Sequence, residues 1–353
     1  MKSESGLQNK IKVLVIYNVV EKLLYGSDKE KAAEEDTIMQ AKTVTNVLKK
    51  LGYQVFEMEV YDNFEEEILK WKDKVDLVFN LTEGVGNDLM KAPYVPFILE
   101  SMGFNYTGCG WESLLLTMDK GKTKEHLSAY NIPTPEYAVM SEVPKKTPRN
   151  LTYPLFVKPV MSDASYGIDK NAVVHSFPQL VERVAYILEV YKMPALVEDF
   201  VDGMDVHIGV MGNDYDNLET MLPYAIIYKN LPADEYPIIT FDNKFDPESH
   251  MAKNTYVVNP APFDDTTTDE IMDLTEKVYR VSKCSGYARL DFRIDKNMKP
   301  FFLEMNANPS LDPESGFIIS AQEKGMDYNA FIDKIAQYGL ERRDAYAQIY
   351  KTI

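Results

Sequence analysis

The stretch Phe301–Ser310 (FFLEMNANPS) carries oxygen-bearing side chains at alternate positions of an expected strand. Successive side chains of a strand point to opposite faces, so the stretch would have two distinct faces. The apolar face would hold Phe301, Leu303 and Met305, and the opposite face would hold Phe302, Glu304, Asn306 and Asn308. A solvated face more often carries Lys, Thr or Ser, whereas hard cations prefer carboxylate and amide oxygens. The pattern therefore indicates a metal-binding strand.

The preceding stretch Gly286–Ile294 (GYARLDFRI) alternates in the same way, and Lys296–Lys299 would form a hairpin loop between the two strands. A loop of four residues would pair Asp295 with Pro300, Asp291 with Glu304, and Arg289 with Asn306. Opposed side chains lie about 4.5–5.5 Å apart at Cβ, so two carboxylates there would repel unless a cation lay between them. We therefore predict that Asp291, Glu304 and Asn306 bind Mg2+ or Mn2+.

Arg289 would lie beside this metal and could stabilise developing negative charge. The alternative interpretation of the same residues is a solvated ladder of ion pairs on a sheet face, formed by Arg289, Asp291 and Arg293. The Asn and Glu residues of the second strand favour the metal site.

A second group of residues suits phosphate binding. Lys158 ends an apolar strand, Tyr153–Pro159, and the loop MSDASYG that follows contains Ser162 and Ser165. Small side chains let backbone N–H groups approach phosphate oxygens. The loop is not a Walker loop, and the chain lacks GxGxxG, so a nicotinamide cofactor is not expected.

Two acids follow this loop at the ends of strands. Glu198 could accept a hydrogen bond from an adenine amino group, and Asp205 could bind ribose hydroxyls. The alternative for each is an ordinary surface acid.

Composition limits the class of protein. The chain has 353 residues, of which 45% are hydrophobic and 26% charged, enough for two or three globular units. A formal charge of −17 repels nucleic acid. The two cysteines are far apart in sequence, the four histidines lack metal-ligand spacing, and no apolar run suits a signal peptide or membrane span. A cytoplasmic protein without nucleic-acid or membrane partners is expected.

The elements that position these residues fall into three predicted units. Residues 1–117 alternate strands and helices and predict a Rossmann-like domain with a parallel sheet. Residues 118–195 would form a central domain and residues 196–353 a C-terminal domain, so the class combines α/β and α+β. The stretch Asn230–Pro262 is expected to be a long irregular loop, a feature that is usually functional.

Taken in order, these segments resemble the ATP-grasp superfamily and, within it, the D-alanine–D-alanine ligases. The resemblance covers nearly the whole chain and rests on Tyr94–Gly110, Met118–Lys124, Asn131–Pro135, the Lys158 strand and its loop, LVEDFVDGMD, and RLDFRI with FFLEMNANPS. It implies a three-domain ATP-grasp fold with ATP between two domains, Mg2+, small amino acid or carboxylate substrates, and a homodimer.

The resemblance also implies roles for matching residues. Lys120 and Lys158 would contact ATP phosphates, and Lys244 (in TFDNKFD) would be the mobile-loop lysine near the γ-phosphate. Glu198 would bind the adenine amino group, Val201 would make a backbone contact, and Asp205 would bind ribose. The metal ligands would be Asp291, Glu304 and Asn306. Arg289 would stabilise a tetrahedral intermediate, and Ser315 would hold the second substrate's carboxylate.

The sequence departs from the family at positions that bind the amino acid substrate. Glu83-Gly84 stands where the family has a His-Gly pair, Ala164 replaces a serine, and Phe245 replaces a tyrosine. The usual GG-x-S-x-E stretch is missing, with Glu34 and Glu35 as candidates for its acid. The residues that match the family's nucleotide-binding positions are therefore all present, whereas several that match its D-alanine-binding positions are changed.

These observations predict an ATP-dependent carboxylate–amine ligase that works through an acyl phosphate, with Glu83 among its catalytic candidates. Its substrates would be two amino acids, or an amino acid and a carboxylate metabolite. The alternatives are a true D-alanine–D-alanine ligase, a kinase that stops at the phosphorylated substrate, and a nucleotide-binding protein without ligase activity.

Overall fold

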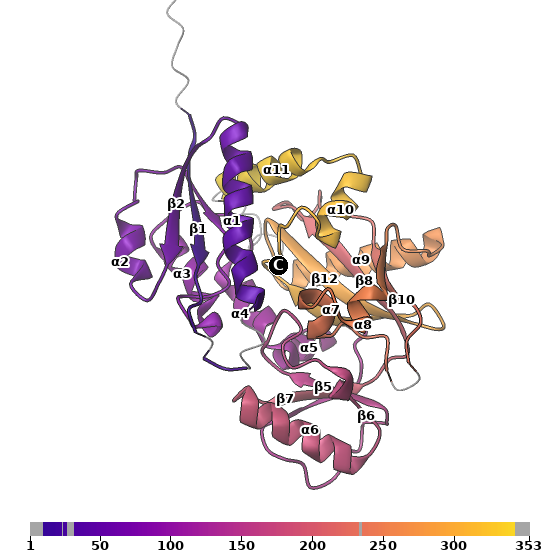
Figure 1. Ribbon diagram of the computed structural model, residues 1–353. Helices are drawn as coiled ribbons and strands as arrows, with labels where there is room; N and C mark the ends of the chain where they lie inside the picture. Colours follow the sequence, from indigo (N-terminus) through magenta and orange to yellow (C-terminus); the bar gives the residue numbers. More distant parts are fainter. Residues whose placement is uncertain (1–9, 23, 27–31, 233–234, 343–353) are drawn as a thin grey trace, which may run out of the picture.

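The computed structural model describes residues 10–22, 24–26, 32–232 and 235–342, which build three sheets (Figure 1). The first sheet has the order β2-β1-β3 and is parallel. Its strands are β1 (Lys12–Asn18), β2 (Gln54–Val60) and β3 (Leu77–Asn80). The helices of this unit are α1 (Ala32–Lys50), α2 (Phe64–Leu69), the 3-10 helix η2 (Leu89–Lys91), α3 (Tyr94–Ser101) and α4 (Trp111–Met118). The Rossmann-like parallel sheet predicted at the N-terminal end is confirmed.

Strand β1 is buried on both faces, as its continuous apolar run predicts. Val13 and Val15 share a core cluster with residues of α1 and of α11 (Tyr328–Leu340). Leu14 and Ile16 pack on the opposite face with residues of α2 and α3. A helix from the far end of the chain therefore completes the core of the first unit.

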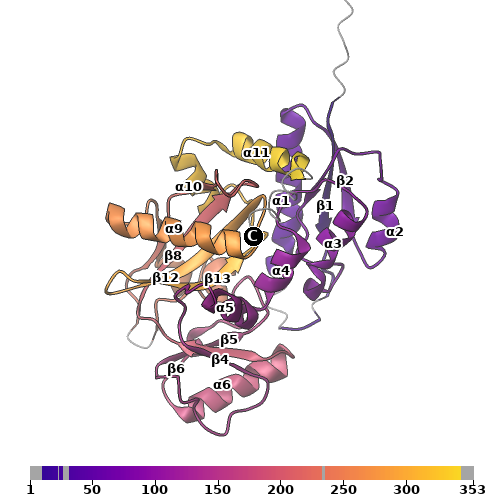
Figure 2. The same ribbon diagram turned by 180° about the vertical axis from the view of Figure 1, so that it is seen from behind.

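The second sheet is antiparallel, with the order β4-β7-β5-β6. Its strands are β4 (Tyr137–Met140), β5 (Leu155–Pro159), β6 (Val173–Val174) and β7 (Ala195–Asp199). Its helices are α5 (Lys120–Ser128), which leads into it, the 3-10 helix η3 (Lys170–Ala172) and α6 (Phe177–Val190). Helix α6 covers the face that points away from the third sheet (Figure 2), which leaves the other face available for a site.

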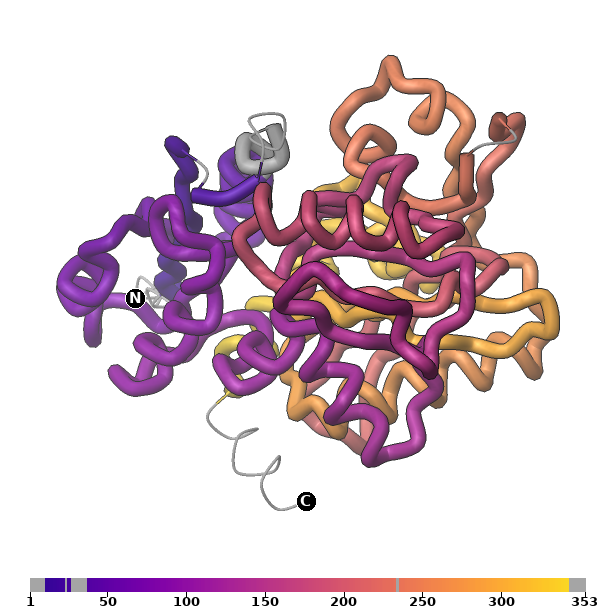
Figure 3. Tube along the Cα trace, turned by 90° about the horizontal axis from the view of Figure 1, so that it is seen from below, coloured from indigo at the N-terminus to yellow at the C-terminus, as the bar shows by residue number. Residues whose placement is uncertain are grey.

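The third sheet follows the order β11-β10-β8-β12-β13, with β9 paired to β8. Its strands are β8 (Gly203–Met211), β9 (Glu219–Thr220), β10 (Tyr224–Tyr228), β11 (Thr255–Val258), β12 (Tyr287–Asp295) and β13 (Pro300–Asn306). Helix α9 (Asp265–Val281) packs on the apolar face, against Val206, Ile208, Leu290 and Phe292. Seen from below, the second unit lies across the third, and the first unit stands to one side (Figure 3).

The prediction of a long irregular loop over Asn230–Pro262 is wrong in part. The described portion contains α7 (Phe241–Phe245), α8 (His250–Lys253) and β11. Thr240 and Asn243 form a capping box that begins α7, and the Ser249 side chain caps α8. Phe241 is buried in the core of the second unit, so the segment bridges the second and third sheets.

The hairpin β12–β13 keeps part of its predicted register. Asp291 opposes Glu304 and Arg289 opposes Asn306, as predicted, but Pro300 faces Ile294 rather than Asp295. The strand bounds leave Lys296–Lys299 as the connecting loop, as predicted, and the Asp295 carboxylate accepts hydrogen bonds from the N–H groups of residues 297 and 299 within it. Asp291 pairs with Glu304, but the next residue, Phe292, pairs with Phe302. The register of β12 against β13 therefore shifts by one residue here, which marks a β-bulge in β13.

This bulge overturns the predicted division of β13 into two alternating faces. Phe302 and Met305 both lie in the core beneath the sheet, although Phe302 was expected to share a face with Glu304. Leu303 is the extra residue of the bulge, and both Leu303 and Glu304 line the same pocket. Two consecutive side chains therefore face the site.

Gly209, in the middle of β8, leaves room for the ring of Phe317 on α10 (Gly316–Glu323). A Cβ atom at Gly209 would lie 2.0 Å from Cε2 of Phe317, which is itself buried. We expect Gly209→Ala to lower the free energy of unfolding by about 1–3 kcal/mol, measured by urea denaturation, because the packed ring must move. An unchanged denaturation midpoint would show that α10 relocates without cost.

Both cysteines, Cys109 and Cys284, are free thiols buried in the core. Among the described residues, no helix is long and apolar enough to cross a membrane.

Candidate active site

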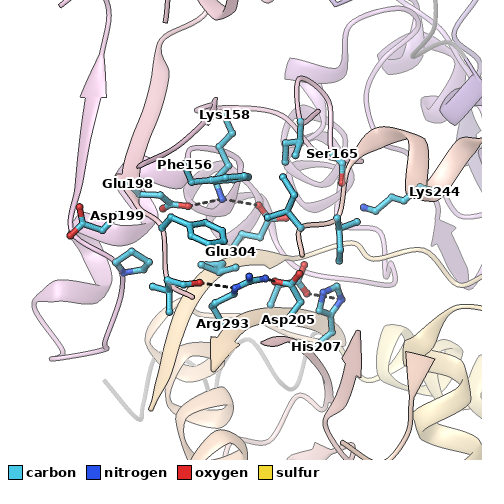
Figure 4. A pocket seen from close by; sticks show the side chains of 18 residues that line it. Phe156, Lys158, Ser165, Glu198, Asp199, Asp205, His207, Lys244, Arg293 and Glu304 are labelled. Atoms are coloured by element: carbon cyan, nitrogen blue, oxygen red, sulfur yellow. Dashed lines mark hydrogen bonds and ion pairs between the residues drawn. The ribbon is translucent and has the colours of Figure 1, made fainter. Parts of the chain in front are cut away.

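A pocket lies between the second and third sheets and gathers predicted site residues from both (Figure 4). Those that line it are Lys158, Ser165, Glu198, Val201, Asp205, Lys244, Asp291 and Glu304. Phe156, Phe200, Ile238 and Leu303 add apolar walls. The pocket thus has a charged region and a region suited to a flat apolar group.

The third sheet positions its polar residues in one row. Register places Tyr224 of β10 beside His207 of β8, His207 beside Asp291 of β12, and Asp291 beside Glu304 of β13. The opposite face of the same strands is the apolar core under α9. Alternation therefore aims the row at the pocket.

Glu198 is held between two lysines at the floor of the pocket. Its Oε2 lies 3.0 Å from Nζ of Lys124, and its Oε1 lies 3.1 Å from Nζ of Lys158. Burial by itself would raise the pKa of Glu198, but the two ammonium charges outweigh it and hold that pKa below its usual value. Burial lowers the pKa of Lys124, and Glu198 offsets this only in part.

Sequence reasoning missed Lys124 as a site residue. It is fully buried and also donates to Thr134 Oγ1, so it connects α5 to the start of the second sheet. A signal was present: Lys120 and Lys124 are four residues apart and share one face of a helix.

Glu304 faces two further cations. Its Oε2 lies 3.5 Å from Nζ of Lys120 and 4.0 Å from Nζ of Lys158. Burial would raise the pKa of Glu304, but these lysines outweigh it, so the pKa is lowered. Lys120 also donates to the main-chain carbonyl of Ser162, so this predicted serine takes part through its backbone.

Asp291 is paired with Arg289 two residues earlier on β12. Nε and Nη2 of Arg289 donate to Oδ1 and Oδ2 of Asp291 at 2.8 and 2.9 Å. His207 Nδ1 lies 3.5 Å from Oδ1. Burial would raise the pKa of Asp291, but Arg289 and His207 outweigh it and hold that pKa far below its usual value. Asp291 is therefore ionised at neutral pH.

These cations change the expectation that Asp291 and Glu304 would simply repel. The pair is already compensated by Arg289, Lys120 and Lys158. Asn306 Oδ1 accepts from the N–H of Asn308 at 3.0 Å, which leaves one lone pair for another partner. Two ionised carboxylates and an amide form an oxygen-only set, which fits Mg2+ completed by water and phosphate oxygens. The described residues contain no group of three or more His, Cys, Asp or Glu that could hold a metal by itself.

Asp205 at the other end of the pocket is also paired. Its Oδ1 lies 2.6 Å from Nη1 of Arg293, and the Tyr228 hydroxyl donates to its Oδ2 at 3.0 Å. Arg293 Nε donates to the carbonyl of Val201. Arg293 is buried and pairs across strands with Asp205, so it is not part of the solvated ladder considered as the alternative. Of that ladder only the pair of Arg289 with Asp291 is present.

Lys244 and Ser165 approach the pocket from connecting segments (Figure 4). Lys244 is in the last turn of α7. Ser165 and Ala164 both have positive φ angles, so this phosphate-loop candidate makes a tight left-handed turn. Phe245 stacks on Phe241 with ring centroids 4.6 Å apart, which directs it into the second unit's core.

Other predicted residues lie outside the pocket lining. Ser315 caps the start of α10 without a side-chain capping bond, and its buried Oγ has no partner among the described residues. Glu83 is exposed, and its N–H donates to Asn18 Oδ1. The adjacent Thr82 carbonyl accepts from Asn308, which places the Glu83 loop beside the end of β13. The side chains of Glu34 and Glu35 lie outside the described residues.

The order of strands, the two lysine-bearing segments and the acid pair define an ATP-grasp ligase. The family described as D-ala D-ala ligase C-terminus matches residues 127–337. The chain belongs to this family, and it is an ATP-dependent enzyme that forms C–N bonds.

Similar proteins agree with this assignment. The chain is 30% identical over 259 residues to "Uncharacterized protein y4sG" of Sinorhizobium fredii, covering 73% of each chain. It is 27% identical to a D-alanine–D-alanine ligase of Carboxydothermus hydrogenoformans, covering 88% of this chain and 95% of that one. Its fold matches a D-alanine–D-alanine ligase of Bacillus anthracis complexed with ATP, with a TM-score of 0.74, 19% identity, and coverage of 95% and 99%.

Proposed function

We propose that the enzyme joins two amino acids, or an amino acid and a carboxylate metabolite, through an acyl phosphate formed from ATP. One observation carries this proposal: the ionised pair Asp291 and Glu304 faces a pocket that also receives Lys158 and Lys244. A strongly acidic protein places cations here, where a polyphosphate needs them.

The reaction has two steps. The carboxylate of the first substrate attacks the γ-phosphorus of ATP, and ADP leaves. The amine of the second substrate then attacks the acyl carbon, loses a proton, and phosphate leaves. Phosphoryl transfer depends on positioning and charge neutralisation, which are the roles of Lys120, Lys158 and Lys244. Arg289 stabilises the negative charge that develops on the acyl oxygen.

The remaining residues hold the nucleotide. The apolar wall that includes Phe156 and Leu303 takes the adenine ring, with Glu198 and the backbone of Val201 at its edge and Asp205 near the ribose. Ser165 belongs to the loop that covers the phosphates. Asp291, Glu304 and Asn306 would hold Mg2+ or Mn2+, which when bound neutralises charge on the phosphate oxygens.

The identity of the amino acids is the second part of the proposal. The names of its relatives favour D-alanine, whereas Glu83, Ala164 and Phe245 differ from that pattern and favour another amino acid or carboxylate. Ala164 and Phe245 stand where the family has hydroxyl-bearing residues, and neither has a hydroxyl to offer to a substrate. Both side chains pack on the core of the second unit. The proposal also includes domains at residues 1–117, 118–195 and 196–353, a homodimer and a cytoplasmic location.

The test is a screen of amino acid pairs for phosphate release with ATP and Mg2+. For an active pair, Lys158→Ala, Asp291→Ala and Glu304→Ala should each abolish ADP release. Lys253→Ala is the matched control, because Lys253 is an exposed lysine whose one ion pair within the described part of the chain is with Glu248, so the variant should retain full activity. Normal turnover in all three site variants would contradict the assignment.

A further inference from the structure

Arg293 is a buried residue of β12 to which the proposed function gives no role. Only 3% of the residue is exposed, yet it lines the pocket beside Asp205 (Figure 4). A buried guanidinium needs an opposite charge and several acceptors, because its desolvation is otherwise costly. The groups that Arg293 contacts therefore show what it holds in place.

Two of these groups belong to the connection between the second and third sheets. Residues 200–202 join β7 to β8, so they link the two walls of the pocket. Nε of Arg293 donates to the main-chain carbonyl of Val201 at 2.9 Å. Its guanidinium carbon lies 5.2 Å from the centre of the Phe200 ring, which is a cation–π distance. Arg293 therefore holds this connection from the side of the third sheet.

A third group belongs to the segment that covers the pocket, residues 236–245. Ile238 and Ile239 line the pocket from this cover segment. Nη1 of Arg293 donates to the main-chain carbonyl of Pro237 at 2.8 Å. Arg293 therefore joins the cover segment to the third sheet at the point where the segment enters the pocket.

The cover segment is fixed to the second unit on either side of this contact. The Tyr236 hydroxyl lies 2.8 Å from Nε2 of His175, which follows strand β6. Further along, the N–H of Phe241 donates to the carbonyl of Ile168 at 3.0 Å, and the Phe241 ring is buried in the core of the second unit. The cover segment thus bridges the two walls of the pocket, and Arg293 supplies a link to the third sheet.

Lys244, at the other end of the cover segment, has anchors of its own. The capping box of Thr240 and Asn243 begins α7, and Nδ2 of Asn243 donates to Oγ1 of Thr255 on β11 at 2.6 Å. None of these contacts involves Arg293. Loss of Arg293 should therefore leave the phosphate end of the pocket in place and affect the base end.

We propose that Arg293 is a positioning residue that holds the base end of the nucleotide pocket closed. This inference rests on the proposed function, because that function places the adenine base at this end. Arg293 acts through the carbonyls of Val201 and Pro237, which it ties to the third sheet. Its charge is balanced by Asp205, whose Oδ1 lies 2.6 Å from Nη1.

The experiment measures the Kd for ATP by isothermal titration calorimetry in the wild type and in Arg293→Met. We expect the Kd to rise roughly tenfold or more, since two hydrogen bonds from a charged donor are lost. The kcat at saturating ATP, measured by ADP release with an active amino acid pair, should change by less than about threefold, because the phosphate end keeps its geometry. A parallel fall in kcat would contradict a role confined to the base end.

Arg293→Lys keeps the charge beside Asp205 and carries the test if Arg293→Met does not fold. Lysine lacks the planar fork that reaches both carbonyls, so we expect the Kd for ATP to remain raised. A wild-type Kd in Arg293→Lys would overturn the proposal, because charge alone would then be sufficient.

Arg342→Met is the matched control. It removes another buried guanidinium, which donates to the carbonyls of Tyr106 and Gly108 and does not line the pocket. Its Kd for ATP should stay within about twofold of the wild type, since the two sites share no partners. A wild-type enzyme that binds ATP but releases no phosphate with any amino acid pair would overturn the proposed function and leave the role of Arg293 in binding intact.

Discussion

Replacing Arg289 with methionine is expected to lower kcat roughly 10²–10³-fold, the loss typical of a missing oxyanion donor. The guanidinium projects from β12 toward the site and holds Asp291 with two hydrogen bonds. Stabilisation of a charge that appears only in the transition state affects kcat, so the KM for ATP should change by less than about threefold. Steady-state measurement of ADP release separates these two constants.

Two further variants separate catalysis from stability. Arg289→Lys keeps a positive charge but loses the planar fork, so we expect partial activity with normal folding. Arg289→Met combined with Asp291→Asn removes the uncompensated buried charge and should restore the thermal midpoint without restoring activity. Recovery of full turnover in the double variant would refute a direct role for Arg289.

The second large effect is expected from Glu198→Gln, which should lower the free energy of unfolding by about 3–5 kcal/mol at pH 7. This change leaves Lys124 and Lys158 buried together without the carboxylate that separates them. Urea denaturation measures the loss. Adding Lys124→Met to Glu198→Gln should recover much of the lost unfolding free energy, because one of the two unpaired buried charges is then removed. Wild-type stability of Glu198→Gln alone would contradict a stabilising role for this carboxylate.

The pH dependence of stability gives an independent check on the same triad. The pKa of Glu198 is lower in the folded chain than in the unfolded chain. Its contribution is therefore fully present above the unfolded pKa of about 4.3 and is lost as pH falls below that value through the folded pKa. The difference in unfolding free energy between the wild type and Glu198→Gln should shrink over this acid range. A constant difference would exclude the carboxylate as its source.

The hairpin that carries the proposed metal ligands could be predicted, because polar and apolar residues alternate along both of its strands. Asp291 opposes Glu304 as expected, since their separation along the chain suits a short hairpin. The bulge could not be predicted, because the alternating pattern and the four-residue loop are equally compatible with an even ladder, whereas the register shifts between Asp291 and Phe292. The faces of Phe301, Phe302 and Leu303 were therefore wrong, while the pairing of the acids was right.

Residues that act through tertiary contacts were harder to find. Lys124 reads as a surface lysine on a polar helix, and only the fold brings Glu198 to it. Of the proposed nucleotide-binding residues, Lys158 and Glu198 lie near the ends of strands β5 and β7, where the sequence pattern predicts them.

The bulge at Leu303 has a consequence for how this site can change. A regular strand offers a ligand every second residue, so a hydrophobic contact and an acid would stand two positions apart. Here the extra residue Leu303 lines the pocket immediately before Glu304, and Glu304 stays opposite Asp291. In the proposed function Leu303 contacts the adenine base. Removing Leu303 would restore an even ladder without turning Glu304 away. Substitutions at Leu303 could therefore change the proposed affinity for the base without moving Asp291 or Glu304.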